Sequence, residues 1–258
     1  MLNNTEELTR ARNEYAYPPF CLTRSSKPID ESLILWGMPV DIYGPDQFDE
    51  HRSSGFSSFE LDQYHCKLLR SDDDEKVLLG VASITFWGFA LGKGRFTINR
   101  ALARAKIVAG LGKRAADAPE TITRAVRNIA TFLDGGKRQE AIIEAMGLRH
   151  HGLAFASKLL AFSNPATESV YDEVISLRLK CAKDPRLTKL HVLTVGQHHI
   201  AEKASAYEGW AELCFDKAAQ LNLNNSQWRD WDGKNRAWRA VDVERAFFSL
   251  GRERVSHK

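Results

Sequence analysis

The sequence predicts a mainly α-helical protein in which an irregular N-terminal segment packs on a helical body. Two observations favour this all-α fold class. From residue 71 onward, apolar residues recur with a helical period between recognisable caps and stops. Strand-like alternation is rare, and its best candidate is the short run HVLTV at residues 191–195. We therefore expect one compact unit built from two helical lobes.

The beginning of the chain differs in composition from the rest. Its first 60 residues are rich in Pro, Gly, Ser and Asp and have few periodic apolar positions. Such a composition is typical of loops. We expect residues 1–70 to form an irregular segment that packs on the helical body at residues 71–258.

Three helices are predicted at the start of the helical body. SDDDEKVLLG (residues 71–80) has the acidic first turn of a helix, and the apolar run behind it predicts a buried helix that ends near Gly92. A second helix fits residues 97–109, with its basic residues along one side. APETITRAVRNIATFLDGG predicts a third, because Pro stands in its first turn and two glycines follow it.

The last third of the chain repeats this helical pattern. Residues 195–221 predict a long helix, and RAVDVERAFFSLGRER predicts a final amphipathic one. Between them, QWRDWDGKNRAW predicts a turn.

Composition limits the classes of protein to consider. Hydrophobic residues make up 43% and charged residues 27% of the 258 positions, as in an ordinary globular protein. No run reaches the roughly eighteen apolar residues of a membrane helix, and the polar N-terminus does not resemble a secretory signal. The four cysteines have no metal-binding spacing, and no nucleotide-binding glycine motif occurs. We expect a cytoplasmic protein without a metal ion or cofactor.

Basic residues cluster between positions 93 and 114, where no acid occurs. Clustered Lys and Arg attract phosphates, although a solvated helix face has the same pattern. The cluster consists of Lys93, Arg95, Arg100, Arg104, Lys106, Lys113 and Arg114. Arg100, Arg104 and Lys106 are the residues that we predict to contact DNA.

Residues 137–163 predict a helix, a tight turn and a second helix. The first helix is the amphipathic stretch KRQEAIIEAM, and the turn is GLRHHG. Backbone N–H groups at such a turn can hold a phosphate without reading sequence, whereas a plain connection between two helices needs no ligand. The predicted phosphate-binding residues are Gly147, Arg149, His150, His151 and Gly152.

The order of helix, hairpin, helix, Pro-containing loop and aspartate resembles the helix-hairpin-helix DNA glycosylase superfamily, in particular its 8-oxoguanine glycosylase (OGG) branch. The resemblance implies a hairpin that binds the DNA backbone and a pocket for a flipped base. FWGFALGKGRFTINRALARA and WRAVDVERAFFSLGR also resemble OGG-fold proteins of bacterial antiphage operons, including type IV CBASS. This implies partner proteins from such an operon, in addition to duplex or single-stranded DNA.

The resemblance implies a catalytic role for Asp172. In this family an aspartate at the start of the helix after the loop stabilises the positive charge that develops on the sugar as the base departs. The alternative is that Asp172 only caps its helix. One residue can do both.

Lys158 is the second catalytic candidate. Bifunctional members of the family use a lysine of the second hairpin helix as an amine nucleophile. Their lysine stands further from the aspartate and in the first turn, whereas Lys158 precedes Asp172 by fourteen residues and lies well inside its helix. The family spacing leads to Gly152 or its two successors, none of which can form an imine. Lys158 is therefore either a displaced nucleophile or a packing or phosphate-binding lysine.

Aromatic residues are candidates for a base pocket, because a flipped base stacks on aromatic rings. Core packing is the alternative for each of them. The candidates are Trp87, Tyr171, Trp238 and Phe247. Asp242 and Glu244 are either pocket carboxylates or members of ion pairs on a helix surface.

Two functions follow as hypotheses. The first is a DNA glycosylase that flips a purine or modified purine and cleaves its N-glycosidic bond, more readily with water as nucleophile than as a lyase. The second keeps the OGG fold without this chemistry and binds nucleic acid, a nucleotide or a protein partner in a defence system.

Overall fold

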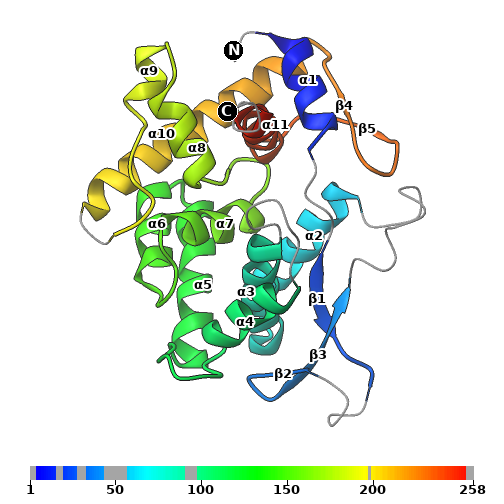
Figure 1. The fold of residues 1–258 in the computed structure, drawn as a ribbon, viewed down its shortest axis with the longest axis vertical. Coiled ribbons are helices and arrows are strands. Elements are labelled where there is room, and N and C mark those ends of the chain that lie inside the picture. Colours follow the sequence, from blue (N-terminus) through cyan, green and yellow to red (C-terminus); the bar gives the residue numbers. More distant parts are fainter. Residues whose placement is uncertain are drawn as a thin grey trace.

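Helices make up most of the described chain, which confirms the predicted fold class (Figure 1). This computed structural model describes residues 4–15, 20–27, 33–43, 57–90, 98–196 and 199–253. In these ranges, no helix combines the length and the apolar character that crossing a bilayer requires. The helices are α1 (Thr5–Asn13), α2 (Ser58–Leu69), α3 (Asp74–Ala90), α4 (Ile98–Val108), α5 (Pro119–Asp134), α6 (Arg138–Gly147), α7 (Leu153–Ser163), α8 (Glu173–Lys180), α9 (Pro185–Thr188), α10 (Ile200–Leu223) and α11 (Ala240–Glu253).

The N-terminal segment contains more regular structure than its composition predicts. Besides α1 and α2, it holds an antiparallel sheet in the order β1-β3-β2, formed by β1 (Cys21–Arg24), β2 (Leu33–Leu35) and β3 (Met38–Tyr43). Trp36 and Gly37 join β2 to β3 with φ angles of 49° and 81°. Two left-handed residues make the tight turn that suits the twist of a hairpin. The dipeptide Trp-Gly is an uncommon signal for that turn.

The predicted strand at residues 191–195 is wrong, because these residues form no ladder. Side chains of neighbouring segments bond to this stretch of backbone instead. The Ser176 hydroxyl donates to the carbonyl of Val192, whose N–H donates to the Tyr171 hydroxyl. The described strands of the last third are β4 (Trp228–Arg229) and β5 (Asn235–Arg236), which lie within the stretch predicted as a turn and form a short hairpin there.

Helix α3 runs through the middle of the helical body. All of its residues from 77 to 87 are buried, as expected of a helix that is apolar on every side. Two glycines let neighbouring helices approach it closely. A Cβ on Gly80 would lie 3.0 Å from Leu68 of α2, and one on Gly88 would lie 2.9 Å from Phe155 of α7.

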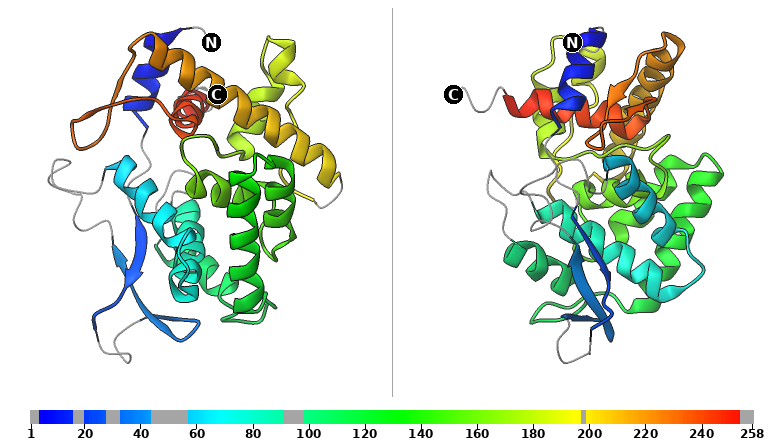
Figure 2. Two further views of the ribbon diagram at one scale, coloured as in Figure 1. Left: turned by 180° about the vertical axis from the view of Figure 1, so that it is seen from behind. Right: turned by 90° about the vertical axis from the view of Figure 1, so that its right-hand side faces the viewer.

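The first and last described helices pack against each other, with α1 and α11 at one end of the molecule and the three-stranded sheet at the other (Figures 1 and 2). A buried ion pair joins them, because the Arg12 guanidinium lies 2.9 Å from Asp242. Asp242 also pairs with Arg239, and Asp62 of α2 pairs with Arg245. The N-terminal segment is therefore attached to the helical body by buried charges.

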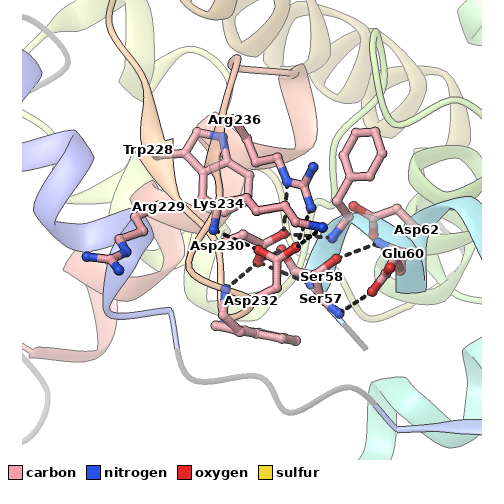
Figure 3. Close-up of polar contacts among 12 residues, drawn as sticks. Ser57, Ser58, Glu60, Asp62, Trp228, Arg229, Asp230, Asp232, Lys234 and Arg236 are labelled. Carbon is pink, nitrogen blue, oxygen red and sulfur yellow. Dashed lines mark hydrogen bonds and ion pairs between the residues drawn. The ribbon is translucent and has the colours of Figure 1, made fainter. Parts of the chain in front are cut away.

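The β4–β5 hairpin holds the beginning of α2 (Figure 3). Asp230 accepts hydrogen bonds from the backbone N–H groups of Ser58 and Phe59, both at 3.1 Å. Ser57 and Glu60 complete a capping box at the same helix end. Residues far apart in the sequence therefore fix the position of α2.

Candidate active site

Helices α6 and α7 form a helix–turn–helix unit with residues 148–152 between them. His150 carries the left-handed backbone of this turn at φ 67°, while Gly147 and Gly152 do not adopt positive φ. The Arg149 N–H donates to the Asp117 carboxylate at 2.6 Å. No side chain caps the beginning of α7, so its first backbone N–H groups have no side-chain acceptor among the described residues.

The three basic residues of the turn lie in different environments. Arg149 is exposed and lies 3.6 Å from Asp117, and His150 is exposed with its ring on the Ala115 carbonyl. His151 is buried, and burial lowers its pKa, so it is neutral at pH 7. Of the three, Arg149 and His150 remain reachable by a phosphate.

Arg104 of α4 lies near this turn, because it lines the same small cavity as His150 and His151. Arg100 and Lys106 are exposed, and the half-buried Arg104 lies 5.0 Å from the ring centre of Phe89. Gly92, Lys93 and Arg95, which belong to the predicted helix end and the basic cluster, lie outside the described residues.

A small cavity of about 30 Å³ separates the turn from α3 and α4. This is enough for about one or two water molecules and far below the several hundred Å³ of a typical ligand site. A purine does not fit into it without movement of the surrounding side chains. Its lining consists of Thr85, Phe89, Arg104, Ile107, Val108, His150, His151 and Phe155.

Asp172 is the N-cap of α8. One of its carboxylate oxygens accepts a hydrogen bond of 3.0 Å from the N–H of Ile175. The side chain is half-buried, and its other oxygen accepts no hydrogen bond from the described residues. Asp172 therefore caps its helix and keeps one oxygen for a second role.

Lys158 is buried inside the same region. Only 5% of the residue is exposed, and its Nζ donates to the Ala154 carbonyl at 3.0 Å and lies 5.0 Å from the ring centre of Phe155. Its stem passes Gly88, where a Cβ would approach the Lys158 Cδ to 3.1 Å. Burial lowers the pKa of Lys158, against the opposing charge of Asp172.

Glu244 is the third ionisable group of this region, and the prediction of a surface ion pair for it is wrong. It is 3% exposed and has no hydrogen bond or ion pair within 4.0 Å among the described residues. Burial, and then the charge of Asp172, raises the pKa of Glu244 to about 8. The sequence contains an indication of this burial. Glu244 lies one helical turn after Val241 and one turn before Phe248, and both of these apolar side chains are buried. Asp242 is also buried, in its ion pairs with Arg12 and Arg239.

Backbone contacts bring α11 to the loop that precedes Asp172. The N–H groups of Ala240 and Val241 donate to the carbonyls of Ala166 and Pro165, at 3.1 and 3.3 Å. The first turn of α11 therefore lies directly on this loop.

An apolar contact shows why the three ionisable groups converge. Val241 packs with Ala161 of α7 and Val170 of the loop in one buried cluster. Lys158 lies one turn from Ala161, Glu244 lies one turn from Val241, and Asp172 follows Val170 by two residues. This convergence agrees with the charges that act on Lys158, which come from Asp172 and Glu244.

The aromatic candidates for a base pocket do not meet around a cavity. All four are buried, and each has partners in the core. The Trp87 ring lies 5.0 Å from Phe162, and Phe247 lies 5.1 Å from Trp210. The Tyr171 hydroxyl donates to the Leu190 carbonyl, and the Trp238 indole donates to the Ser226 hydroxyl. Their placement agrees with the core alternative.

Comparisons of this chain with protein-family models, with curated proteins and with solved structures found no match. The resemblance to the OGG branch therefore stands on the sequence segments alone. The function has to be argued from the site.

Proposed function

We propose that the protein cleaves an N-glycosidic bond in a nucleic acid, with Asp172 and Lys158 acting at the sugar. The observation that carries this proposal is the convergence of a buried amine and a partly exposed carboxylate after a helix–turn–helix unit. Their separation in sequence argues against such a meeting, yet the hydroxyl of Ser157, which directly precedes Lys158, accepts a hydrogen bond of 2.9 Å from the N–H of Tyr171, which directly precedes Asp172.

Asp172 has one oxygen available for the reaction. The oxygen that caps α8 fixes the orientation of the carboxylate, and the second can stabilise positive charge on the sugar as the bond to the base breaks. A carboxylate that is already oriented needs little rearrangement in the transition state.

Lys158 supplies a nucleophile of the required kind. An amine attacks only in its neutral form, and burial lowers the pKa of Lys158 toward that form. Its proximity to Asp172 supports a lysine-dependent reaction over the water-dependent one that sequence spacing favours. Nζ would bond to C1′ as the bond to the base breaks, and the base would leave with its electron pair and a proton. Opening of the sugar ring at the C1′–O4′ bond would give the imine, and elimination of the 3′ phosphate would then cleave the strand.

The outer surface of the helix–turn–helix unit suits a phosphate backbone. The uncapped N–H groups at the beginning of α7 attract anions, and Arg149, Arg100 and Lys106 are exposed cations. DNA as the nucleic acid, a modified purine such as 8-oxoguanine as the base, and a place in an antiphage operon are proposed from the sequence resemblance.

A strand-cleavage assay tests this function. Duplex and single-stranded oligonucleotides with normal, 8-oxo- and deaza-modified guanines are incubated with the protein and then treated with hot alkali or borohydride. We expect cleavage that Asp172→Asn and Lys158→Met reduce by at least about 100-fold.

Two matched variants serve as controls. Asp184 caps α9 as Asp172 caps α8, and Lys203 is a buried lysine that bonds to backbone carbonyls elsewhere. Asp184→Asn and Lys203→Met should retain the activity. Equal losses in the controls, or no cleavage of any substrate by the wild-type protein, would contradict the proposal.

The small cavity favours a second candidate function, in which the protein binds nucleic acid or a partner without cleaving it. The cavity of about 30 Å³ is too small for a base and is not lined by Lys158 or Asp172, and Lys158 itself is nearly enclosed. Oligonucleotide binding that weakens with salt and persists in Asp172→Asn, without cleavage, would support this candidate.

A further inference from the structure

We propose that Glu244 is an acid–base residue of the candidate site that supplies the proton consumed when Lys158 forms an imine with a sugar aldehyde. This proposal rests on the proposed function, because it uses the same amine of Lys158, here on the ring-opened aldehyde of a sugar that has already lost its base. It adds a residue from the last helix to the Lys158–Asp172 pair.

The position of Glu244 is the first argument. It lies on the buried face of α11, where an apolar residue is expected. Burial of a carboxyl group there reduces the stability of the fold unless the group is paired or protonated. Among the described residues, no hydrogen bond or ion pair within 4.0 Å compensates Glu244. The neutral acid is therefore its favoured form in the resting protein.

The charges around Glu244 are the second argument. Five charged or ionisable side chains act on Glu244. Four of them belong to other parts of the chain, and the fifth is its neighbour on α11. They are Arg12 of α1, Lys158 of α7, Asp172 before α8, Cys214 of α10 and Arg245 of α11 itself.

The two arginines do not ionise Glu244, because other carboxylates hold them. Arg12 pairs with Asp242, and Arg245 pairs with Asp62. The remaining cation is Lys158, whose own pKa burial lowers. Since desolvation disfavours both charged forms, the buried pair favours a neutral amine beside a neutral acid, with the pKa of Glu244 raised to about 8.

A neutral amine and a neutral acid are the two reactants that imine formation needs. Nζ of Lys158 attacks the aldehyde carbon, an N–C bond forms, and the carbonyl electron pair moves to oxygen. A proton passes from nitrogen to this oxygen to give the carbinolamine. The C–O bond then breaks as Glu244 donates its proton, water leaves, and the nitrogen lone pair forms the C=N bond. The products are an iminium on Lys158, a carboxylate on Glu244 and water.

The carboxylate that remains has a second effect. It lies beside the new positive charge of the iminium, where a buried anion stabilises a buried cation. Glu244 would therefore act both as the proton donor and as the counter-charge of the intermediate.

The first measurement needs no enzymatic activity. The δ-carboxyl signal of Glu244 is followed by carbon-13 NMR in glutamate-labelled protein and assigned with Glu244→Gln. We expect a midpoint near pH 8. In Lys158→Met the midpoint should rise further, because the amine that can take up a proton and stabilise the ionised carboxylate of Glu244 is gone. A midpoint in the ordinary range of glutamate would overturn the proposal.

The second measurement is borohydride trapping on an oligonucleotide with a preformed abasic site. Glu244→Gln should slow adduct formation by at least about tenfold at pH 7. The wild-type rate should change slope near pH 8, and the variant should lose this change. Glu173→Gln, an exposed neighbour of Asp172, is the matched control and should behave as the wild type. Circular dichroism confirms that each variant is folded.

The outcomes separate this proposal from the proposed function. Equal rates and pH profiles for the wild type and Glu244→Gln would overturn the role of Glu244 while leaving Lys158 in place. No adduct with the wild type, but alkali-dependent breaks in the base-containing oligonucleotides, would overturn it too and would leave base excision by water standing.

Discussion

Burial sets the protonation behaviour of Lys158 and Glu244. Both side chains are almost fully buried, and burial moves their pKa values in opposite directions. Asp172, at the edge of the same site, is half-buried and remains reachable. Groups in such different environments can divide the roles of nucleophile, acid and charge stabiliser among them.

The raised pKa of Glu244 predicts a change in stability with pH. Between about pH 4.5 and 8 the folded protein keeps a proton on Glu244 that the unfolded chain releases. The stabilisation that the protonated Glu244 gives to the folded protein is therefore complete below pH 4.5 and is lost as pH rises through 8. Glu244→Gln keeps a neutral group at this position, so we expect it to change stability little at pH 5 and to raise it by roughly 5 kcal/mol at pH 9.

Urea unfolding at the two pH values measures this difference, with Glu173→Gln as the exposed control. A variant that is equally destabilised at both pH values would show that Glu244 is ionised or hydrogen-bonded in the folded protein.

Close packing of helices α3 and α7 fixes the position of Lys158. Gly88 of α3 faces the Lys158 stem and the Phe155 ring, so a methyl group there has no space. The orientation of the Lys158 side chain therefore depends on a glycine of the neighbouring helix.

A substitution at Gly88 should displace Lys158. In Gly88→Ala the new Cβ lies 2.9 Å from Phe155 and 3.1 Å from Lys158, and one of them has to move. We expect a loss of about 1–3 kcal/mol in stability and a reduction of trapped adduct by more than tenfold. Gly135→Ala is the control, because its nearest atoms lie at 3.5 Å or more. Retention of the full adduct yield in Gly88→Ala would argue that the position of Lys158 does not limit the reaction.

The ion pairs of helix α1 predict different losses of stability for two arginine substitutions. Arg12 and Arg10 both form ion pairs from α1, but the Arg12–Asp242 pair is fully buried and the Arg10–Glu14 pair is exposed. Arg12→Ala leaves Asp242 with fewer partners in the core and should cost about 3–5 kcal/mol of unfolding free energy. Arg10→Ala should cost less than about 1 kcal/mol.

Thermal and urea unfolding of the two variants compare these costs directly. Similar losses for both would mean that the N-terminal helix is held by its apolar contacts, and that its buried charges add little to stability.

On the scale of the whole molecule, local signals in the sequence predicted the helices and missed the contacts between them. Pro119 at the first turn and Gly135 at the end located α5, and the apolar period located α11. The sequence did not predict α1, α2 or the small sheet. They belong to a segment rich in Pro, Gly and Ser, in which few apolar residues recur with a regular period.

The candidate site shows the same division. Asp172 was found because a cap and a loop can be read locally. The spacing between Lys158 and Asp172 did not predict that their two chain segments are in contact, because residue counts do not reveal how the intervening loop folds back. That loop is held by contacts across the molecule: Glu168 accepts from Arg138 of α6 and Tyr207 of α10. Glu244 could be suspected only from a charged residue in an apolar stripe.

The central claim is that Lys158 and Asp172 form one reactive site, and identification of the trapped amine tests it most directly. The protein is incubated with an abasic oligonucleotide, reduced with borohydride, digested and analysed by mass spectrometry. We expect the sugar remnant to be attached to Lys158, and we expect Asp172→Asn to lower its yield while Asp184→Asn does not. An adduct on a different amine, or none in the wild-type protein, would contradict it.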